Sequence, residues 1–419
     1  MGVGPAALEG LVSEAGSCRF CSAPLTQTFA DLGHSPLANS LLAESELESA
    51  EPVYPLHAYV CGACFLVQLG QVATPEEIFE DYVYFSSFSD TWVDHARRYA
   101  AQMVERFGIG QESQVVEVAS NDGYLLQWFK ELGVPVLGVE PARNVAAAAE
   151  ERGIPTVVRF FGAETAEELD VRADLLVANN VLAHVPDLND FVAGLKVVLA
   201  PSGVATLEFP HLLKLIEETE FDTIYHEHFS YFSLLTAERV FAAHGLQFFD
   251  VEELPTHGGS LRIYARHAGE GSEPEPAVGK LREEERAAGL DRVDTYAAFG
   301  ERVERTRRSV REFLERARAQ GRTVVGYGAA AKGVTLLNYC HVGPELVEYV
   351  VDRSPHKQGL YLPGARLPIS PPERVNETRP AYLFLLAWNL KDEIVEQMAH
   401  IRTWGGKFVT PVPEVAVHE

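Results

Sequence analysis

The segment Phe221–Phe232 concentrates side chains that could do acid–base chemistry. It places imidazoles, a carboxylate and phenols close together inside an apolar frame, at Tyr225, His226, Glu227, His228 and Tyr231. Groups held near apolar surface can have pKa values moved towards neutrality, and they then serve as an acid or a base. The same residues also suit a polar loop, or a strand whose histidines are only hydrogen-bonded. The rest of the chain has to decide between these interpretations.

Four of the five cysteines form two pairs near the start of the chain. Cys18 and Cys21 make one C-x-x-C motif, and Cys61 and Cys64 make the other. Thiolates at this spacing fit a tetrahedral zinc site to which each pair supplies two ligands. Redox dithiols or disulfides are the alternatives, but a reducing cytoplasm disfavours disulfides, and neither pair has a thioredoxin-like context. The pattern predicts one structural zinc ion without an open catalytic position.

The acid–base residues at 225–231 need a fold that positions them. The first elements of that fold are a buried strand, a tight turn and a helix between Gln114 and Phe129. This order is the first unit of a doubly wound sheet. The turn lacks the G-x-G-x-x-G pattern of a pyrophosphate cradle. It resembles the E/D-x-G-x-G-x-G loop of class I S-adenosylmethionine methyltransferases, with Ala119 and Asn121 in place of two glycines. A methionine moiety leaves room for such small side chains, because no phosphate has to approach the loop.

Further candidate cofactor residues follow the next strands. Glu140 ends the second strand, where a carboxylate commonly accepts hydrogen bonds from ribose hydroxyls. An adenine ring could lie against the aromatic residues at 160–161. The fourth strand leads to His184, which is either catalytic or a histidine at the start of a helix. Because ligands gather at the carboxyl ends of strands in open sheets, we predict a site for S-adenosylmethionine formed by Glu117, Ala119, Ser120, Asn121, Gly123, Glu140, Pro141, Asn144, Phe161, Asn179 and Asn180.

An aromatic segment precedes this sheet. It includes Tyr82 and Tyr84 and runs into an amphipathic helix predicted over 90–107. Such a cluster of Tyr, Phe and Ser either packs between domains or forms the wall of a ligand pocket. The many hydroxyl groups of this segment favour the wall of a ligand pocket over packing between domains.

Residues 277–321 have the helical spacing of a strut that joins domains. The pattern predicts two helices, the second of roughly 30 residues and about 45 Å. Beyond them, Thr323–Gly333 is typical of a strand, a Gly-rich turn and a helix start, in which backbone amides and Lys332 could bind a phosphate. The alternative is a purely structural α/β lobe. The candidate substrate-binding residues are Gly328, Ala330, Lys332, Asp352, Lys357 and His257.

Composition narrows the range of partners. The 419 residues are 47% hydrophobic and 23% charged, as in ordinary soluble proteins, and they carry a formal net charge of −25. A surface this acidic repels nucleic acid and anionic lipid, so we expect neither as a partner. No apolar run is long enough for a membrane span, and the N-terminal residues lack the features of a signal peptide. We therefore expect a cytoplasmic protein.

Together the motifs resemble those of sugar C-methyltransferases, in particular the C-3′-methyltransferases of dTDP-deoxysugar (antibiotic sugar) biosynthesis. The shared features occur in the same order along nearly the whole chain: both C-x-x-C pairs, Glu117–Gly123, Tyr225–His228, His257–Arg262 and Gly326–Lys332. The combination is far more specific than any one of these motifs.

The resemblance implies an α/β fold with three domains. These are a small zinc-binding domain at 1–75, a Rossmann-like class I methyltransferase domain at 76–275, and a helical strut with a second Rossmann-like lobe at 276–419. The family binds S-adenosylmethionine in the middle domain and a dTDP-4-keto-6-deoxysugar between the last two. We expect a monomer, because both lobes already supply the substrate cleft.

The resemblance also implies a reaction. A ketone at C4 of the sugar acidifies the proton on C3, and removal of this proton gives an enolate that attacks the methyl group. By resemblance, His228 with Glu227 is the base, and Tyr225 places the sugar. His184 and one of the two tyrosines named above would flank the C4 oxygen, where an enolate needs hydrogen-bond donors. No metal ion is needed for this step.

Two other functions stay open. One is a methyltransferase that acts on another small carbon acid, and the other is a non-enzymatic sensor of a nucleotide sugar or cofactor. The density of ionisable groups at the strand ends argues against a sensor. The phosphate-binding character of the C-terminal lobe favours a substrate with a nucleoside diphosphate. Whether C3 of the sugar carries an amino or a hydroxyl group is open as well.

Overall fold

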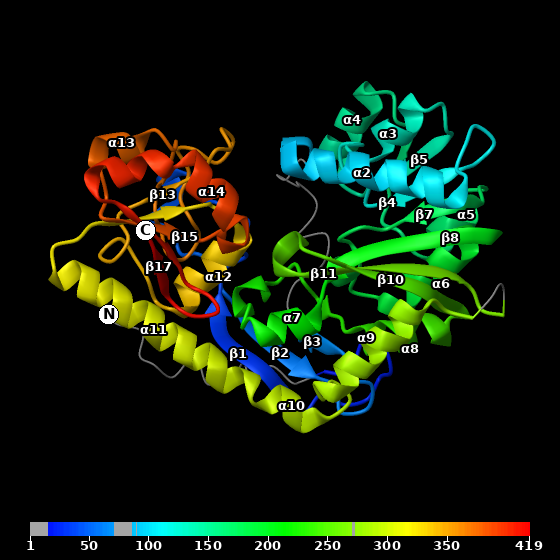
Figure 1. The fold of residues 1–419 in the computed structure, drawn as a ribbon, viewed down its shortest axis with the longest axis horizontal. Helices are drawn as coiled ribbons and strands as arrows, with labels where there is room; N and C mark the ends of the chain where they lie inside the picture. The colour runs from blue at the N-terminus through cyan, green and yellow to red at the C-terminus, as the bar shows by residue number, and fades with distance from the viewer. Residues whose placement is uncertain (1–15, 71–85, 89, 270–272) are drawn as a thin grey trace.

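The computed structural model describes residues 16–70, 86–88, 90–269 and 273–419. Two α/β lobes face each other, and a small N-terminal sheet and the long helix α11 (Phe299–Ala319) run along the same side of both (Figure 1). Across these described ranges, no helix is long and apolar enough to cross a membrane.

The lobe drawn in cyan and green is built on a seven-stranded sheet with the order β10-β11-β8-β7-β4-β5-β6 (Figure 1). Strands β4 to β8 run parallel, and β11 is antiparallel to both β8 and β10. The strand order reverses between β4 and β7, as expected for a doubly wound sheet. The strands are β4 (Val115–Val118), β5 (Val136–Val139), β6 (Thr156–Val157), β7 (Ala173–Val177), β8 (Leu199–Pro210), β10 (Leu246–Leu254) and β11 (Ser260–His267).

Helices cover both faces of this sheet, because successive strand residues point to opposite sides. Val116 and Val118 belong to a core that also contains Phe191 and Phe241. Val115 belongs to the core on the other face. The helices of this lobe are α2 (Asp90–Phe107), α3 (Leu126–Glu131), α4 (Arg143–Glu151), α5 (Ala163–Glu168), α6 (Leu188–Val198), α7 (Leu212–Glu217), α8 (Leu234–Ala243) and α9 (Pro276–Ala287).

The C-terminal lobe has a six-stranded sheet with the order β14-β13-β12-β15-β16-β17. Five strands are parallel, and the edge strand β17 is antiparallel. The order reverses between β12 and β15, which places a ligand-binding crevice at the start of helix α12. The elements are β12 (Val324–Tyr327), α12 (Ala331–Tyr339), β13 (Val350–Val351), β14 (Ile369–Ser370), α13 (Arg374–Thr378), β15 (Tyr382–Leu385), α14 (Lys391–Gln397), β16 (Lys407–Thr410) and β17 (Ala416–His418).

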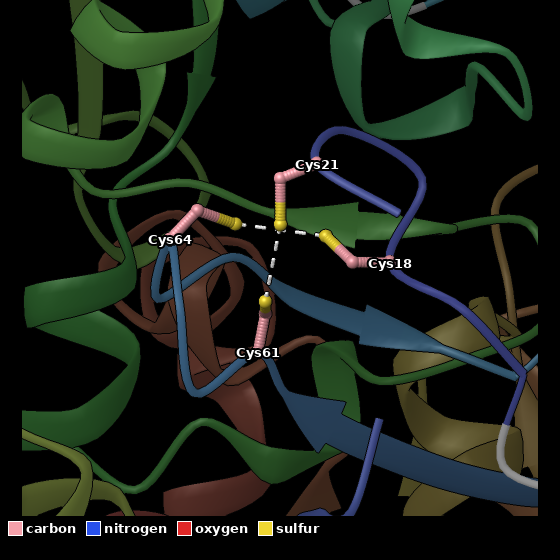
Figure 2. Close-up of side chains that lie close together, drawn as sticks. All are labelled: Cys18, Cys21, Cys61 and Cys64. Carbon is pink, nitrogen blue, oxygen red and sulfur yellow. Dashed lines mark hydrogen bonds between the residues drawn. The ribbon is translucent and has the colours of Figure 1, made fainter. Parts of the chain in front are cut away.

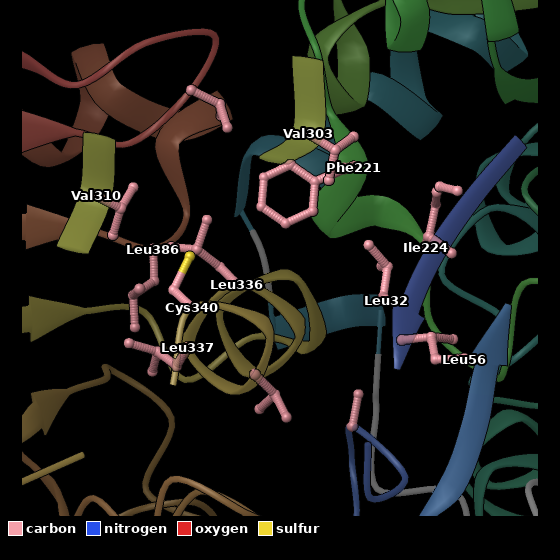
Figure 3. Packing of buried hydrophobic residues seen from close by; sticks show 14 of the residues in the cluster. Leu32, Leu56, Phe221, Ile224, Val303, Val310, Leu336, Leu337, Cys340 and Leu386 are labelled. Carbon is pink, nitrogen blue, oxygen red and sulfur yellow. The ribbon is translucent and has the colours of Figure 1, made fainter. Parts of the chain in front are cut away.

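The N-terminal sheet joins the two lobes through a shared core. Its strands are β1 (Gln27–Ser35), β2 (Tyr54–Val60), β3 (Val67–Leu69) and β9 (Ser230–Tyr231), and β9 comes from the middle of the chain. Figure 3 shows Leu56 of this sheet, Ile224 of the middle segment and Leu337 of the C-terminal lobe in one hydrophobic cluster. Our division of the chain near residues 75 and 275 stays a prediction.

The predicted second helix of the strut is divided in two. A short helix, α10 (Val293–Ala297), is separated at Ala298 from α11, which has 21 residues rather than roughly 30. The aromatic rings on either side of the break both contact Phe29 of β1: the ring of Phe299 stacks on it at 4.3 Å, and the ring of Tyr296 meets it edge-on at 6.1 Å. Packing against the N-terminal sheet therefore accompanies the break in the helix.

We predict that Phe29→Ala lowers the free energy of unfolding by about 3–5 kcal/mol, since it leaves a cavity among fully buried aromatic rings. Phe29 is only 1% exposed. Urea unfolding followed by tryptophan fluorescence would measure the change. Val53→Ala is the matched control, because Val53 is 54% exposed and its truncation should change stability by less than about 0.5 kcal/mol. Equal effects of the two substitutions would contradict a shared core at Phe29.

Candidate active site

A cleft of about 460 Å³ lies where the two lobes and the N-terminal sheet meet. Its walls include Asn39 from the N-terminal part, the residues that follow β4, β5 and β7, and the start of α12. The volume is in the range of pockets that bind small molecules. The predicted catalytic residues Tyr225, Glu227 and His228 also line it.

The loop after β4 shapes one end of the cleft. Ala119 and Asn121 have backbone φ values of 55° and 49°, in the left-handed region that glycine adopts most easily. These are the two positions where the loop has another residue in place of a glycine of the methyltransferase pattern. The backbone amides of Asn121 and Ala142 donate hydrogen bonds to the two carboxylate oxygens of Glu140, at 3.0 and 2.9 Å. The loop therefore fixes the Glu140 carboxylate against the cleft.

Several buried polar atoms at this end have no hydrogen-bond partner among the described residues. They are Glu117 Oε2, Ser120 Oγ, Asn179 Oδ1 and Asn180 Nδ2. Buried polar groups are normally paired, so these atoms fit a site that a polar ligand completes. Burial raises the pKa of Glu117 well above its usual range, and the charges of Glu140 and Asp122 raise it further.

The structure brings most of the predicted cofactor residues to the cleft. The residues that line it are Ala119, Asn121, Glu140, Pro141, Phe161, Asn179 and Asn180. Glu117, Ser120 and Gly123 are buried and do not line the cleft, and Asn144 is exposed on α4. The donor set of carboxylates, amides and an aromatic ring suits an adenosine with its ribose hydroxyls and an amino-acid group, as in S-adenosylmethionine.

His228 is held as a neutral imidazole with its lone pair on Nε2. Its Nδ1 lies 2.9 Å from the carbonyl oxygen of Thr223, which can only accept, so Nδ1 carries the proton. Nε2 then accepts a hydrogen bond from the hydroxyl of Tyr225 at 2.9 Å. Burial lowers the pKa of His228 well below its usual range, and the nearby imidazole of His184 lowers it further. The ring is therefore a free base at neutral pH.

His184 packs edge-on against His228, with ring centroids 4.8 Å apart. Its Nδ1 donates a hydrogen bond to the backbone carbonyl of Glu227 at 2.8 Å. Burial lowers the pKa of His184 to about 4, so the ring is neutral and its proton lies on Nδ1. In this tautomer Nε2 accepts rather than donates a hydrogen bond. His184 thus holds the chain at Glu227, and in this tautomer it cannot be the hydrogen-bond donor to the C4 oxygen that we expected.

The carboxylate of Glu227 is almost completely enclosed. It is 6% exposed, and the side-chain amide of Asn39 donates a hydrogen bond to Oε1 at 2.5 Å. Burial raises the pKa of Glu227 to about 7, against the lowering effects of Asn39 and of the charge on Lys357. The neighbouring His226 turns towards the N-terminal sheet, where its Nε2 contacts the carbonyl of Pro55 at 3.2 Å. Glu227 is therefore partly ionised near neutral pH.

The C-terminal lobe forms the opposite wall. The ammonium of Lys332 donates to the carbonyl of His257 at 3.1 Å and lies 4.4 Å from the ring centre of Trp388. The indole of Trp388 in turn donates to the carboxylate of Asp222 at 2.7 Å. Burial raises the pKa of Asp222 to about 6, against the charge of Lys332. The hydrogen bond to His257 of the methyltransferase lobe thus fixes the position of Lys332 in the wall of the cleft.

The predicted substrate-binding residues divide into two groups. Ala330, Lys332, Lys357 and His257 line the cleft, whereas Gly328 and Asp352 lie behind the α12 turn. The carboxylate of Asp352 accepts from the backbone amide of Ala329 at 2.7 Å, so this amide is already paired. The other two predicted catalytic residues, Tyr82 and Tyr84, lie outside the described residues.

Sequence reasoning missed several residues of the cleft. Asn39, Trp92, Thr223 and Asn389 line it and belong to no recognisable motif. Trp92 stacks on His95 at 4.9 Å beside the cleft. The position of Trp92 at the start of a predicted amphipathic helix was a weak signal. Thr223 lies within the segment Phe221–Phe232 that the sequence already indicated, whereas Asn39 and Asn389 gave no signal.

The four predicted zinc ligands lie together, and their thiols point to a common centre (Figure 2). All four Sγ atoms are within 4.8 Å of one another, and the pairs Cys18–Cys64 and Cys21–Cys61 are 3.5 Å apart. A tetrahedron with Zn–S bonds of about 2.3 Å requires sulfur separations of about 3.7 Å. The residues therefore fit one zinc ion. The side chain of Gln68 donates to Cys18 Sγ at 3.1 Å, as an outer-shell partner would.

Comparison with known proteins agrees with this arrangement. Three family models match the chain: "Putative zinc binding domain" over 18–79, "Methyltransferase domain" over 92–251 and "C-methyltransferase C-terminal domain" over 255–413. "C-methyltransferase NovU" of Streptomyces niveus is 38% identical over 413 residues, which cover 98% of each chain. "Ubiquinone biosynthesis O-methyltransferase" of Rhodopseudomonas palustris (strain BisB18) is 32% identical over 22% of this chain and 39% of its own length.

Solved structures with a similar region were also found. PH0226 protein from Pyrococcus horikoshii OT3 has a TM-score of 0.36 and 14% identity, and covers 46% of this chain and 97% of its own. Magnesium protoporphyrin IX methyltransferase (ChlM) from Synechocystis PCC 6803 with bound SAH has a TM-score of 0.34 and 12% identity, and covers 42% of this chain and 83% of its own.

The sheet and the matched methyltransferase model define a class I methyltransferase that uses S-adenosylmethionine, with an N-terminal zinc site and a second α/β lobe. This confirms the predicted fold class and cofactors. Because the similarity to the Streptomyces niveus protein spans the whole chain, the chain belongs to its family of C-methyltransferases.

We predict that purified protein holds one zinc ion per chain, and that Cys61→Ser abolishes zinc binding, since three thiolates leave the tetrahedron incomplete. Elemental analysis of the purified variants would measure this. Cys340→Ala is the matched control, because Cys340 is buried far along the chain in another cluster and should not affect the metal content. Full zinc occupancy in the Cys61 variant would contradict the assignment of the four ligands.

Proposed function

We propose that this C-methyltransferase transfers the methyl group of S-adenosylmethionine to C3 of a dTDP-4-keto-deoxysugar. The observation that carries the proposal is one cleft that is lined by most of the predicted cofactor residues, by the buried His228 and Glu227, and by the start of α12. The cofactor, when bound, supplies an electrophilic methyl group. A carbon nucleophile requires prior removal of a proton from the substrate, and a ketone at the adjacent carbon makes that proton acidic.

The side chains support deprotonation without a metal ion. His228 is neutral and has its lone pair on Nε2, and the Tyr225 hydroxyl that donates to this lone pair would have to turn away before Nε2 takes a proton from a bound sugar. The C3–H electron pair becomes the enolate, and the proton passes to Nε2. Glu227 lines the same cleft, and its carboxylate, when ionised, would stabilise the imidazolium that results. His184 keeps Glu227 in place through the backbone carbonyl of that residue.

The two ends of the substrate are proposed to lie on different lobes. The keto sugar would lie against Tyr225 and His228, and the nucleoside diphosphate would extend towards α12. Lys332 and Lys357 line that wall and carry positive charge, and the first turn of α12 adds the positive end of its dipole. A chain with a net charge of −25 needs such local donors to attract an anionic substrate.

The test is incubation with S-adenosylmethionine and a panel of dTDP-4-keto-deoxysugars. We expect the sugar to gain the mass of one methyl group in exchange for hydrogen, with NMR placing the methyl on C3. Without the methyl donor, the C3 hydrogen should exchange with solvent deuterium. A methyl on C5, the other carbon beside the ketone, would contradict the C3 assignment. No mass gain on any keto sugar would refute the proposal.

His228→Asn and Glu227→Gln should each lower kcat by about 10²–10⁴-fold, as expected for loss of a general base or its partner. Turnover would be measured as S-adenosylhomocysteine released. His34→Asn and Glu218→Gln are matched controls on exposed residues and should retain normal turnover. If both active-site variants keep near-normal rates, the base lies elsewhere.

The pH profile should follow the ionisation of Glu227. Because the base pair requires the carboxylate ionised and its pKa is about 7, kcat should rise as the pH passes through about 7. The imidazole of His228, whose pKa is well below its usual range, is neutral throughout this interval. Initial rates between about pH 5 and 9 would show the rise. A profile that falls across neutrality would exclude this role for Glu227.

A further inference from the structure

Asn39 lies on a loop of the zinc-binding part, between β1 and β2 and between the two cysteine pairs. It lines the cleft, and its Nδ2 donates a hydrogen bond to Glu227 Oε1 at 2.5 Å. The two residues are 188 positions apart in the sequence. Among the described residues, Asn39 supplies the side-chain hydrogen bond to this carboxylate. The N-terminal part therefore reaches into the proposed active site.

The loop that carries Asn39 is fixed on both sides. Ala38 is 4% exposed and packs in the core that the N-terminal sheet shares with the C-terminal lobe. Leu42 exchanges two backbone hydrogen bonds with Tyr361 of that lobe, at 3.0 and 2.9 Å. The Asn39 amide is therefore held in place before any substrate binds, as a group that positions a catalytic side chain must be.

Charged and titratable groups approach Glu227 from each element around it. Lys357 of the C-terminal lobe acts on the carboxylate through its charge, and its ammonium is held by the carbonyl of Ala329 at 2.8 Å. His184 contacts the Glu227 backbone, and His228 is the next residue along the chain, bonded to Thr223. None of these three donates a hydrogen bond to the carboxylate oxygens in the described structure.

We propose that Asn39 is a positioning residue for the C-methylation reaction, which fixes the Glu227 carboxylate and favours its ionised form. This inference rests on the proposed role of Glu227. An amide N–H can donate only, so it stabilises the carboxylate anion more than the neutral acid. The zinc-binding part then has a function in the reaction beyond folding, because it supplies this donor.

Asn39→Ala tests the inference through the pH profile. Loss of the donor should raise the pH at half-maximal kcat by about one unit, from about 7 to about 8, and so lower kcat at pH 7 about fivefold, because a hydrogen bond to a charged group is lost. Activity should return towards normal at high pH. A merely structural role for Asn39 would lower the rate at every pH without this shift. Ser40→Ala is the matched control, since Ser40 is the exposed neighbour and should leave the profile unchanged.

Asn39→Asp is the second variant and keeps the size of the side chain. It replaces the donor by a second carboxylate at about the same place, so the pair must share a proton and the profile should move further towards alkaline pH. Calorimetric binding of S-adenosylhomocysteine, whose predicted binding residues do not include Asn39, shows whether each variant is folded. An unchanged profile in folded Asn39→Asp refutes the inference.

Combination with Glu227→Gln separates this inference from the proposed function. If Glu227 acts in the reaction and Asn39 acts through it, Asn39→Ala should cause no further loss in the Glu227→Gln background. Full activity of Glu227→Gln alone would instead remove the proposed role of Glu227, and the inference with it. Loss of activity in Glu227→Gln, with an unshifted profile in Asn39→Ala, would leave the proposed function standing and refute the inference alone.

Discussion

The arrangement of the active site depends on a two-residue strand that pairs outside its own lobe. Ser230 and Tyr231 of β9 pair with Gln68 and Val67 of β3, directly after the Tyr225–His228 turn. The side chain of Gln68 contacts the zinc ligand Cys18, while its backbone pairs with Ser230. One fully buried residue, Gln68, thus connects the metal site to the end of the segment proposed to be catalytic. A two-residue strand is not stable alone. The position of Tyr225–His228 therefore depends on the pairing of β9 with the zinc-stabilised sheet.

Burial sets the charge state of the cleft. It lowers the pKa of His184, His228 and His257, and it raises the pKa of Glu227 to about 7. At neutral pH the three imidazoles are therefore uncharged, and the carboxyl group of Glu227 is near the midpoint of its titration. Desolvation therefore supplies both a free base and a carboxylate that responds to a single hydrogen-bond donor.

The elements that follow local patterns were predictable from the sequence. The βα units gave the parallel strands, and the cysteine spacing gave the zinc site, since both depend on a few adjacent residues. Contacts between distant segments were not predictable. Neither the pairing of Asn39 with Glu227 nor the hydrogen bond between Trp388 and Asp222 leaves a trace in the neighbouring sequence. The predicted length of the strut helix was wrong. Its helical periodicity in the sequence continues across Ala298, where the structure has a break that accompanies tertiary packing.

The hydrogen bond from Trp388 to Asp222, with Lys332 beside the indole, has a consequence for how such enzymes diversify. These contacts make the C-terminal lobe depend on the residues that it meets outside the lobe, so it is not an independent unit that relatives could exchange. A graft that brings a lobe without a tryptophan at 388 leaves a buried carboxylate at 222 unpaired, and a graft without a lysine at 332 leaves it without its counter-ion. Recombination therefore has to carry both sides of this junction together.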